Sequence, residues 1–172
     1  MAQKRLLVDM DGVLADTYQQ FFRLESNITG KKIERENVIG VSEADAFPNY
    51  LSYIHKAGFF RDAPVIENAI EVMKKLNNVY DIFIVSSAME FPNSLREKYD
   101  WLQEHFPFLH WKQIILCGSK IPVQGDILID DHFKNLDYFK KTTLLYTQPH
   151  NMGRDKGHQR VNNWKEIESI LL

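Results

Sequence analysis

Short apolar runs alternate with amphipathic stretches along the 172-residue chain. Each run is bounded by polar residues or glycine, which is typical of a buried strand. The runs predict strands at residues 5–9, 82–85, 114–117, 127–129 and 143–146. Between them, apolar residues recur every three or four positions, as in amphipathic helices. This spacing predicts helices over residues 17–25, 48–57, 66–76, 94–105 and 163–171.

Strands that alternate with helices predict an α/β fold: a doubly wound, mostly parallel, Rossmann-like sheet covered on both faces. The stretch from residue 16 to residue 65 is too long for a simple crossover between two strands. It predicts an inserted, mostly helical module, within which residues 27–46 are polar and poorly patterned. Residues 1–15 and 66–172 are expected to form the core domain.

The composition is that of an ordinary globular protein, with 44% hydrophobic and 26% charged residues. The net charge is −2, and the Lys and Arg residues are scattered, so binding to nucleic-acid polymers or anionic membranes is not expected. No apolar run approaches the length of a signal-peptide core or a membrane span. The single Cys117 lies in an apolar run and is expected to be a small core residue in a reducing, cytoplasmic location.

Two carboxylates mark the end of the first predicted strand. Asp9 and Asp11 are two residues apart, so on an extended strand their side chains point the same way. Two like charges so close are costly unless a cation or a shared proton relieves them. Mg²⁺ prefers such oxygen ligands. The alternative is a solvated turn, because Asp and Gly are common in turns.

Three other predicted strands also end in polar residues. Ser86 and Ser87 follow residues 82–85, Lys120 follows 114–117, and Asp130 and Asp131 follow 127–129. Taken singly, these residues have ordinary explanations as a helix cap, a solvated lysine and a turn. The carboxyl ends of parallel strands meet at one edge of a sheet, where ligands bind. Four such ends together therefore favour a single site.

At this point the chain resembles a known family. Asp9-Met10-Asp11-Gly12-Val13 resembles the first motif of the haloacid-dehalogenase-like (HAD-like) phosphohydrolases, Ser86 their second motif, and Asp130-Asp131 their fourth. More narrowly, the chain is similar to the 5′(3′)-deoxyribonucleotidases over most of its length. This likeness is carried by residues 9–16, 58–60, 97–102 and 126–131, with a weaker echo at 147–151 and Trp164.

The resemblance implies a magnesium-dependent phosphatase that acts on deoxyribonucleoside monophosphates. Asp9 would be the nucleophile that forms an aspartyl-phosphate, and Asp11 would be the general acid and base. Mg²⁺ would be held by Asp9, the carbonyl of Asp11 and Asp131. Asp130 would stand behind Asp131 or take its place as the ligand.

The resemblance also assigns residues to the phosphate. The hydroxyl of Ser86 and the backbone N–H groups of Ser87 and Ala88 would hold the transferring oxygens. Lys120 would neutralise the developing charge, with Lys98 as a second candidate for that role. Positioning and electrostatics carry most of the work in phosphoryl transfer, which suits such a set.

In this superfamily a module inserted after the first motif caps the site, and here it would span residues 16–65. The deoxyribonucleotidases carry a base-stacking aromatic residue where this chain has Thr17, and the neighbouring Tyr18 is a candidate substitute. His132 stands where a basic Arg or Lys is expected. All three are candidate substrate contacts.

Aromatic residues of the predicted cap divide into two groups. Phe59 and Phe60, at the end of the cap, are candidates for contact with a nucleobase, because aromatic rings stack on bases. Phe21, Phe22 and Tyr50 have helical spacing, and we expect them to form the small core of the module.

Two alternatives keep part of this chemistry. The substrate could be another small phosphate ester, such as a sugar phosphate. A receiver-type regulatory domain also carries an acidic cluster at strand ends, a hydroxyl and a lysine. The long insert and Asp11 argue against a receiver-type domain, because a slow regulatory switch does not require a general acid and base. The preferred base, the 5′ or 3′ position of the phosphate and the oligomeric state stay open.

Overall fold

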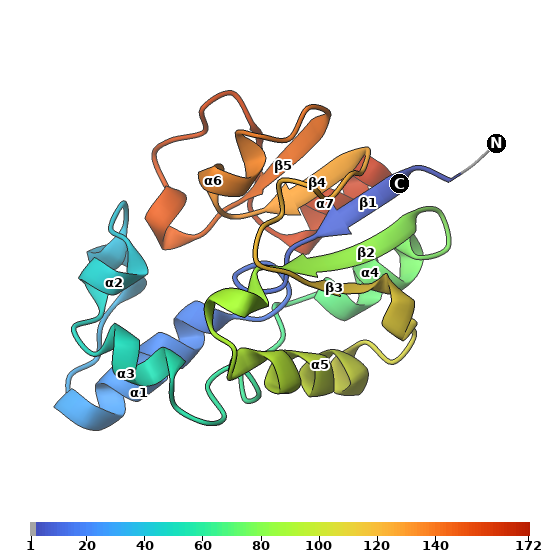
Figure 1. The fold of residues 1–172 in the computed structure, drawn as a ribbon. Helices are drawn as coiled ribbons and strands as arrows, with labels where there is room; N and C mark the ends of the chain where they lie inside the picture. The colour runs from blue at the N-terminus through green and yellow to red at the C-terminus, as the bar shows by residue number, and fades with distance from the viewer. Residues whose placement is uncertain (1–2) are drawn as a thin grey trace.

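A six-stranded, all-parallel sheet forms the centre of the protein in the computed structural model, which describes residues 3–172 (Figure 1). The strand order is β3-β2-β1-β4-β5-β6. Their bounds are β1 Arg5–Val8, β2 Asp81–Ser86, β3 Ile114–Leu116, β4 Ile127–Asp130, β5 Thr142–Tyr146 and β6 Gln159–Val161. In the register of the central strand, Leu7 of β1 lies opposite Phe83 of β2 and Leu128 of β4. The predicted α/β class with a parallel sheet is confirmed.

Helices cover the two faces of the sheet unequally. On one face, α4 (Ala69–Leu76), α5 (Ser94–His105) and α7 (Trp164–Leu171) contribute to the largest apolar cluster, which includes Leu6 and Val8 of β1. On the other face a smaller cluster packs Leu7 of β1 against the short helix α6 (Phe133–Leu136). Alternate residues of a strand point to opposite faces, so one strand supplies both cores. Cys117 is partly buried at the edge of the smaller cluster.

The segment between β1 and α4 lies beyond the carboxyl ends of the strands (Figure 1). It contains α1 (Thr17–Thr29), the 3₁₀ turn η1 (Arg35–Val38), α2 (Glu43–Ala46) and α3 (Tyr50–Ile54). Asp16 starts α1 by accepting a hydrogen bond from the N–H of Gln19. The segment has an apolar cluster of its own, made largely of aromatic rings: Tyr18, Phe21, Phe47, Tyr53, Phe59 and Phe60.

The structure agrees with the predicted strands within one residue at either end and adds one more. The additional strand, β6, is three residues long and contains Gln159 and Arg160, so it carries no apolar run. It nevertheless pairs in parallel with β5 at the edge of the sheet. Its register depends on β5 rather than on its own pattern, and sequence reasoning therefore missed it.

The helix predictions were right in kind and less accurate at their ends. The helix over 94–105 matches α5, whereas α1 continues to Thr29 and α3 covers only Tyr50–Ile54. The predicted helix over 66–76 begins at Ala69, because Asn68 has a left-handed backbone with φ of 63°. Short 3₁₀ turns at η2 (Ala88–Glu90), η3 (Trp111–Gln113) and η4 (Pro149–Asn151) were not predicted. Among residues 3–172, every helix is too short or too polar to cross a lipid bilayer.

Candidate active site

The polar ends of the strands meet at one cavity of about 220 Å³ beneath the segment 16–65. Asp9 and Asp11 come from the loop after β1, Asp131 from the end of β4, Lys98 from α5 and Lys120 from the loop after β3. The remaining wall residues are Thr17, Phe21, Glu43, Tyr50, Ile54, Phe59, Phe60, Ser87, Glu90, Phe91, His132, Lys134 and Asn135. A cavity of this size suits a small molecule rather than a polymer.

The loop after β1 is held tightly against the end of β4. The N–H of Asp9 donates to the carbonyl of Ile129 at 2.9 Å, which continues the strand pairing to the edge of the sheet. Gly12 has φ of 72°, and a Cβ atom at this position would collide with the carboxylate of Asp131. Only glycine therefore fits here without strain. The close approach places Asp9, Asp11 and Asp131 around one point.

Lys120 pairs with two of the buried carboxylates. Its Nζ lies 2.6 Å from Oδ1 of Asp9 and 2.6 Å from Oδ2 of Asp130. Ligand oxygens of Asp9, Asp130 and Asp131 lie within 4.8 Å of one another. Burial, reinforced by the charge of Asp130, raises the pKa of Asp9 to about 8, and burial raises the pKa of Asp131 to about 8. The cluster holds three carboxyl groups and the single ammonium group of Lys120, so this ammonium cannot neutralise all three carboxylates.

The unsatisfied oxygens of the cluster fit a divalent cation. Oδ1 of Asp11 and Oδ1 of Asp131 are buried and have no hydrogen-bond partner within the described chain. An unpartnered buried carboxylate oxygen is costly, and Mg²⁺ prefers hard oxygen ligands of this kind. Asp130 differs, since its oxygens accept hydrogen bonds from Lys120, the N–H of His132 and the side chain of Asn135. Asp131, unlike Asp130, therefore has a carboxylate oxygen left over that could bind a metal ion.

Lys98 connects Asp11 to the end of β2. Its side chain is only 2% exposed, and its Nζ lies 2.5 Å from Oδ2 of Asp11 and 3.0 Å from the hydroxyl of Ser86. The same ammonium lies 4.6 Å from the centre of the Phe60 ring, in a cation–π contact. Lys98 thus fixes the direction of the Asp11 carboxylate and faces the cavity.

The structure brings most of the predicted site residues to the cavity wall: Asp9, Asp11, Thr17, Phe59, Phe60, Ser87, Lys98, Lys120, Asp131 and His132. Ser86, Ala88 and Asp130 are buried directly behind it. Tyr18 is placed differently from the expectation. It is 1% exposed, does not line the cavity, and its hydroxyl lies 3.2 Å from Nδ1 of His150. Tyr18 therefore packs in the aromatic cluster of residues 16–65, and in this structure only Thr17 of the two lines the cavity.

Several wall residues were missed by sequence reasoning. Phe21 and Tyr50 pack in the aromatic cluster of the cap, as expected, but also reach the cavity. Phe91, after η2, stacks on Phe60 with ring centres 6.2 Å apart. Glu43 lies in the polar, poorly patterned stretch, where no periodic signal could have identified it. The aromatic composition of residues 16–65 was the only available signal for Phe21 and Tyr50, and Phe91 lies outside that segment.

Glu97 attaches the end of the cap to helix α5. Its carboxylate accepts hydrogen bonds from the backbone N–H groups of Gly58 at 2.7 Å, Phe60 at 3.1 Å and Arg61 at 3.2 Å. Hydrogen bonds to a charged acceptor are stronger than neutral ones. Glu97 therefore sets the position of Phe59 and Phe60 over the cavity.

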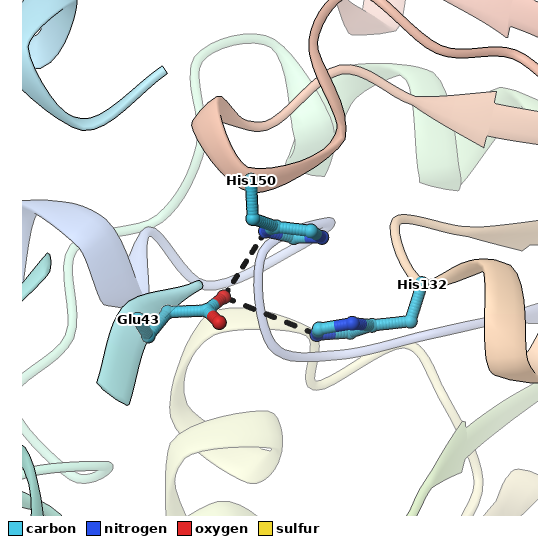
Figure 2. A group of neighbouring side chains, drawn as sticks. All are labelled: Glu43, His132 and His150. Atoms are coloured by element: carbon cyan, nitrogen blue, oxygen red, sulfur yellow. Dashed lines mark ion pairs between the residues drawn. The ribbon is translucent and has the colours of Figure 1, made fainter. Parts of the chain in front are cut away.

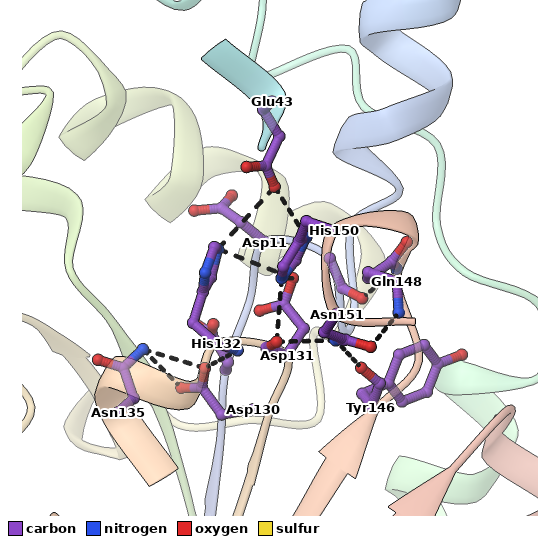
Figure 3. A network of polar contacts seen from close by, with 12 residues as sticks. Asp11, Glu43, Asp130, Asp131, His132, Asn135, Tyr146, Gln148, His150 and Asn151 are labelled. Carbon is purple, nitrogen blue, oxygen red and sulfur yellow. Dashed lines mark hydrogen bonds and ion pairs between the residues drawn. The ribbon is translucent and has the colours of Figure 1, made fainter. Parts of the chain in front are cut away.

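A second polar cluster, made of Glu43, His132 and His150, joins the cap to the core (Figure 2). Oε1 of Glu43 lies 3.1 Å from Nδ1 of His150 and 3.9 Å from Nε2 of His132. Although burial opposes a charge on His150, its contacts with Glu43 and Asp131 raise its pKa to about 9. Although burial opposes a charge on Glu43, His150 lowers its pKa to about 2. Figure 3 shows how this cluster continues through Asp131 and Asn151 towards Tyr146.

Comparisons with known proteins agree with this geometry. A model of the family described as "5' nucleotidase, deoxy (Pyrimidine), cytosolic type C protein" matches residues 3–172. A protein of Bacillus subtilis named 5'(3')-deoxyribonucleotidase is 32% identical over 173 residues, covering 99% of each chain. A Staphylococcus aureus relative is 36% identical over 176 residues, covering 100% of this chain and 97% of its own.

Solved structures of HAD hydrolases have the same fold. A HAD family hydrolase from Deinococcus radiodurans with bound phosphate and sodium has a TM-score of 0.65 at 14% identity, covering 98% of this chain and 95% of its own. A HAD hydrolase from Bacillus subtilis bound to magnesium has a TM-score of 0.63 at 15% identity, covering 99% of each chain. With the full-length sequence match, the chain belongs to the 5′(3′)-deoxyribonucleotidase family of HAD-like phosphoric monoester hydrolases.

Proposed function

We propose that the protein is a Mg²⁺-dependent phosphatase that hydrolyses deoxyribonucleoside monophosphates through an aspartyl-phosphate on Asp9. One observation carries the proposal: Asp9, Asp11 and Asp131 meet the ammonium groups of Lys98 and Lys120 at one wall of a small cavity. The family match and the name of the Bacillus subtilis relative support the substrate class.

Asp9, Asp131 and the backbone carbonyl of Asp11 would hold the Mg²⁺ ion. The bound ion would neutralise part of the negative charge of the phosphate. The unpartnered Oδ1 of Asp131 and the excess of carboxylates over ammonium groups support this ligand set. One solved HAD hydrolase is bound to magnesium, which supports the choice of Mg²⁺ as the ion.

In the first step, a carboxylate oxygen of Asp9 attacks phosphorus and the bond from phosphorus to the ester oxygen breaks. The leaving alkoxide takes a proton from the carboxylic acid form of Asp11, so nucleoside departs and Asp9 carries the phosphoryl group. Lys98, 2.5 Å from Asp11, directs this carboxyl group towards the cavity.

In the second step, the Asp11 carboxylate accepts a proton from a water molecule as that water attacks phosphorus. The bond between phosphorus and Asp9 breaks, which releases phosphate and restores both carboxyl groups to their starting forms. Splitting one difficult hydrolysis into two displacements lowers the barrier of each.

Groups at the end of β2 would bind the oxygen atoms of the phosphoryl group that is transferred. Among the described residues, no acceptor takes a hydrogen bond from the backbone N–H of Ser87 or Ala88. These donors lie beside Lys98, which Ser86 holds through its hydroxyl. Lys120, already paired with Asp9, would offset the charge that develops there.

Residues 16–65 would act as the cap that selects the leaving group. Phe59 and Phe60, fixed by Glu97, form the aromatic part of the cavity that a base would contact. Thr17 lines the same cavity but has no aromatic ring. Phe91 also lines the cavity and stacks on Phe60, so it extends the aromatic part of the wall. We expect a small-molecule substrate and a cytoplasmic location, which the word "cytosolic" in the description of the matched family supports.

Phosphate release from a panel of substrates tests this function. The panel contains deoxyribonucleoside 5′- and 3′-monophosphates, ribonucleotides and sugar phosphates, each with Mg²⁺ and with a chelator. We expect metal-dependent release that is fastest with the deoxyribonucleotides. Faster release from sugar phosphates would keep the mechanism and reject the substrate. A stable phosphoprotein without turnover would favour the receiver-type hypothesis instead.

A further inference from the structure

Glu43, His132 and His150 come from three separate segments, and the phosphoryl-transfer steps use none of them. Glu43 begins α2 in the cap, His132 follows β4, and His150 lies in η4 after β5 (Figure 2). Each offers one potential ligand atom, and these three atoms lie within 4.8 Å of one another. Two imidazoles and one carboxylate are a common ligand set for transition metals.

His150 has the hydrogen bonding of a metal ligand. Its Nε2 lies 3.0 Å from the backbone carbonyl of Asp131, which can only accept, so Nε2 carries the hydrogen. In the neutral ring, Nδ1 then carries the lone pair, and it lies 3.1 Å from Oε1 of Glu43 and 3.2 Å from the hydroxyl of Tyr18, a contact that a bound metal ion would replace. Histidines that bind metals almost always donate their other N–H to a carbonyl or carboxylate, which fixes the ring.

His132 is the adaptable member of the cluster. Its ring nitrogens make no hydrogen bond within residues 3–172, and its side chain is 36% exposed. Its Nε2 lies 3.9 Å from Oε1 of Glu43 and 4.0 Å from Oδ2 of Asp131. Both separations are too long for hydrogen bonds. Two donors around one tetrahedral ion, at bonds of about 2.1 Å, lie roughly 3.4 Å apart, so small shifts suffice.

A rotation of one ring would complete the site. The rings of His132 and His150 stack with centres 4.3 Å apart and planes 14° apart, so one ion cannot lie in the planes of both rings until one of them turns. The χ2 torsion of histidine is soft, so a turn of the half-buried His132 ring would direct its Nε2 lone pair towards an ion held by His150 and Glu43. The carboxylate of Glu43 already faces both rings from one side in Figure 2.

We propose that Glu43, His132 and His150 bind a transition-metal ion such as Zn²⁺, at a site distinct from the all-oxygen magnesium site. Nitrogen ligands favour Zn²⁺ or Co²⁺ over Mg²⁺, so the two sites differ in the ions they select. Glu43 and His132 both line the cavity, so an open position on the ion would face the substrate. Because Glu43 belongs to the cap, the ion would also join the cap to the core.

Cobalt titration tests the site directly. Co²⁺ is added to the untagged, Mg²⁺-saturated protein, and its visible absorption bands report nitrogen ligands in low coordination. We expect bands that saturate at one equivalent and disappear when Zn²⁺ replaces Co²⁺. His132→Asn and Glu43→Gln should each weaken Co²⁺ binding by about 10-fold or more.

Two controls separate this site from others. His55→Asn makes the same substitution at an exposed histidine outside the cavity, and Asp9→Asn alters the proposed magnesium site. Both variants should keep the bands, and circular dichroism checks that every variant is folded. The proposal is wrong if His132→Asn and Glu43→Gln leave Co²⁺ binding unchanged, if no Co²⁺ binds beside Mg²⁺, or if Asp9→Asn removes the bands. None of these outcomes depends on phosphatase activity, so they leave the proposed function untouched.

Discussion

The floor and the roof of the cavity are built by different forces. The floor consists of Asp9, Asp131 and Lys120 at strand ends, where backbone pairing holds the loop of Asp9 and a short ion pair joins Asp9 to Lys120. The roof consists of cap residues that are held by aromatic packing: Thr17, Phe21, Tyr50, Phe59 and Phe60. Ion pairs at the edge of a rigid sheet tolerate little displacement, whereas packed rings adapt. Chemistry should therefore depend on the floor, and substrate selection on the roof.

This division makes kinetic predictions. Floor substitutions should lower kcat or metal affinity, and roof substitutions should change KM. The variants below are ordered from the largest expected effect to the smallest.

Asp9→Asn should have the largest effect. An amide is a poor nucleophile, so we expect kcat to fall by at least about 10³-fold while the protein stays folded. Phosphate release and circular dichroism measure the two quantities. Asp100→Asn, at a half-exposed residue that pairs with Arg96 outside the cavity, is the matched control and should retain full activity. Activity of Asp9→Asn close to that of the unaltered protein would remove Asp9 from the mechanism.

Asp131→Asn should weaken Mg²⁺ binding by about 10- to 100-fold, because it removes an unpartnered charged ligand. A magnesium titration of activity measures this change. Asp130→Asn should instead destabilise the protein, because Lys120 loses the buried charge that it pairs with and Asn135 loses one of its two acceptor oxygens. An unchanged titration for Asp131→Asn, with a weakened one for Asp130→Asn, would exchange their roles.

Glu97→Gln tests the attachment of the roof to the core. The substitution removes the charge that three backbone N–H groups share, which should loosen the loop carrying Phe59 and Phe60. We expect KM for a deoxyribonucleotide to rise by about 10-fold with kcat nearly unchanged. Glu104→Gln on the same helix, where Glu104 pairs with the side chain of Arg61 and with no backbone N–H among the described residues, should leave KM unaltered. An equal loss in kcat would show that the roof takes part in chemistry.

Thr17→Phe should have the smallest effect, and unlike the other substitutions it should improve substrate binding. Thr17 lines the cavity, so an aromatic ring there can stack on a base and lower KM by about 5-fold. The measurement compares KM of the variant and the unaltered protein for a deoxyribonucleotide and for a sugar phosphate. The sugar phosphate has no base, so its KM should not change. Equal changes for both substrates would place the base elsewhere.

The floor could be predicted from the sequence because backbone geometry alone brings strand ends together. Asp9, Lys120 and Asp131 each follow an apolar run, and parallel pairing then places them at one edge. The roof was less predictable. Thr17 and Tyr18 are neighbours on one helix, and only the packing of the cap decides that Thr17 faces the cavity while Tyr18 is buried.

Residues positioned by distant contacts gave no sequence signal. Glu43 lies in a polar stretch, and its role depends on contacts with His132 and His150, which are far away along the chain. Glu97 was recognised only as part of a family-like stretch, whereas its three backbone hydrogen bonds appear in the folded protein alone. Periodicity reports which face is apolar and not which polar groups meet.

Trapping the phosphoryl group on Asp9 tests the central claim most directly. Asp11→Asn is mixed with an aryl phosphate, whose good leaving group needs no general acid, and is quenched in acid. The first step should then proceed while the second, which needs the Asp11 base, stalls. The account predicts a stoichiometric burst of phenol and a phosphorylated peptide modified at Asp9. Phenol release without a burst, or a phosphoryl group on another residue, would contradict it.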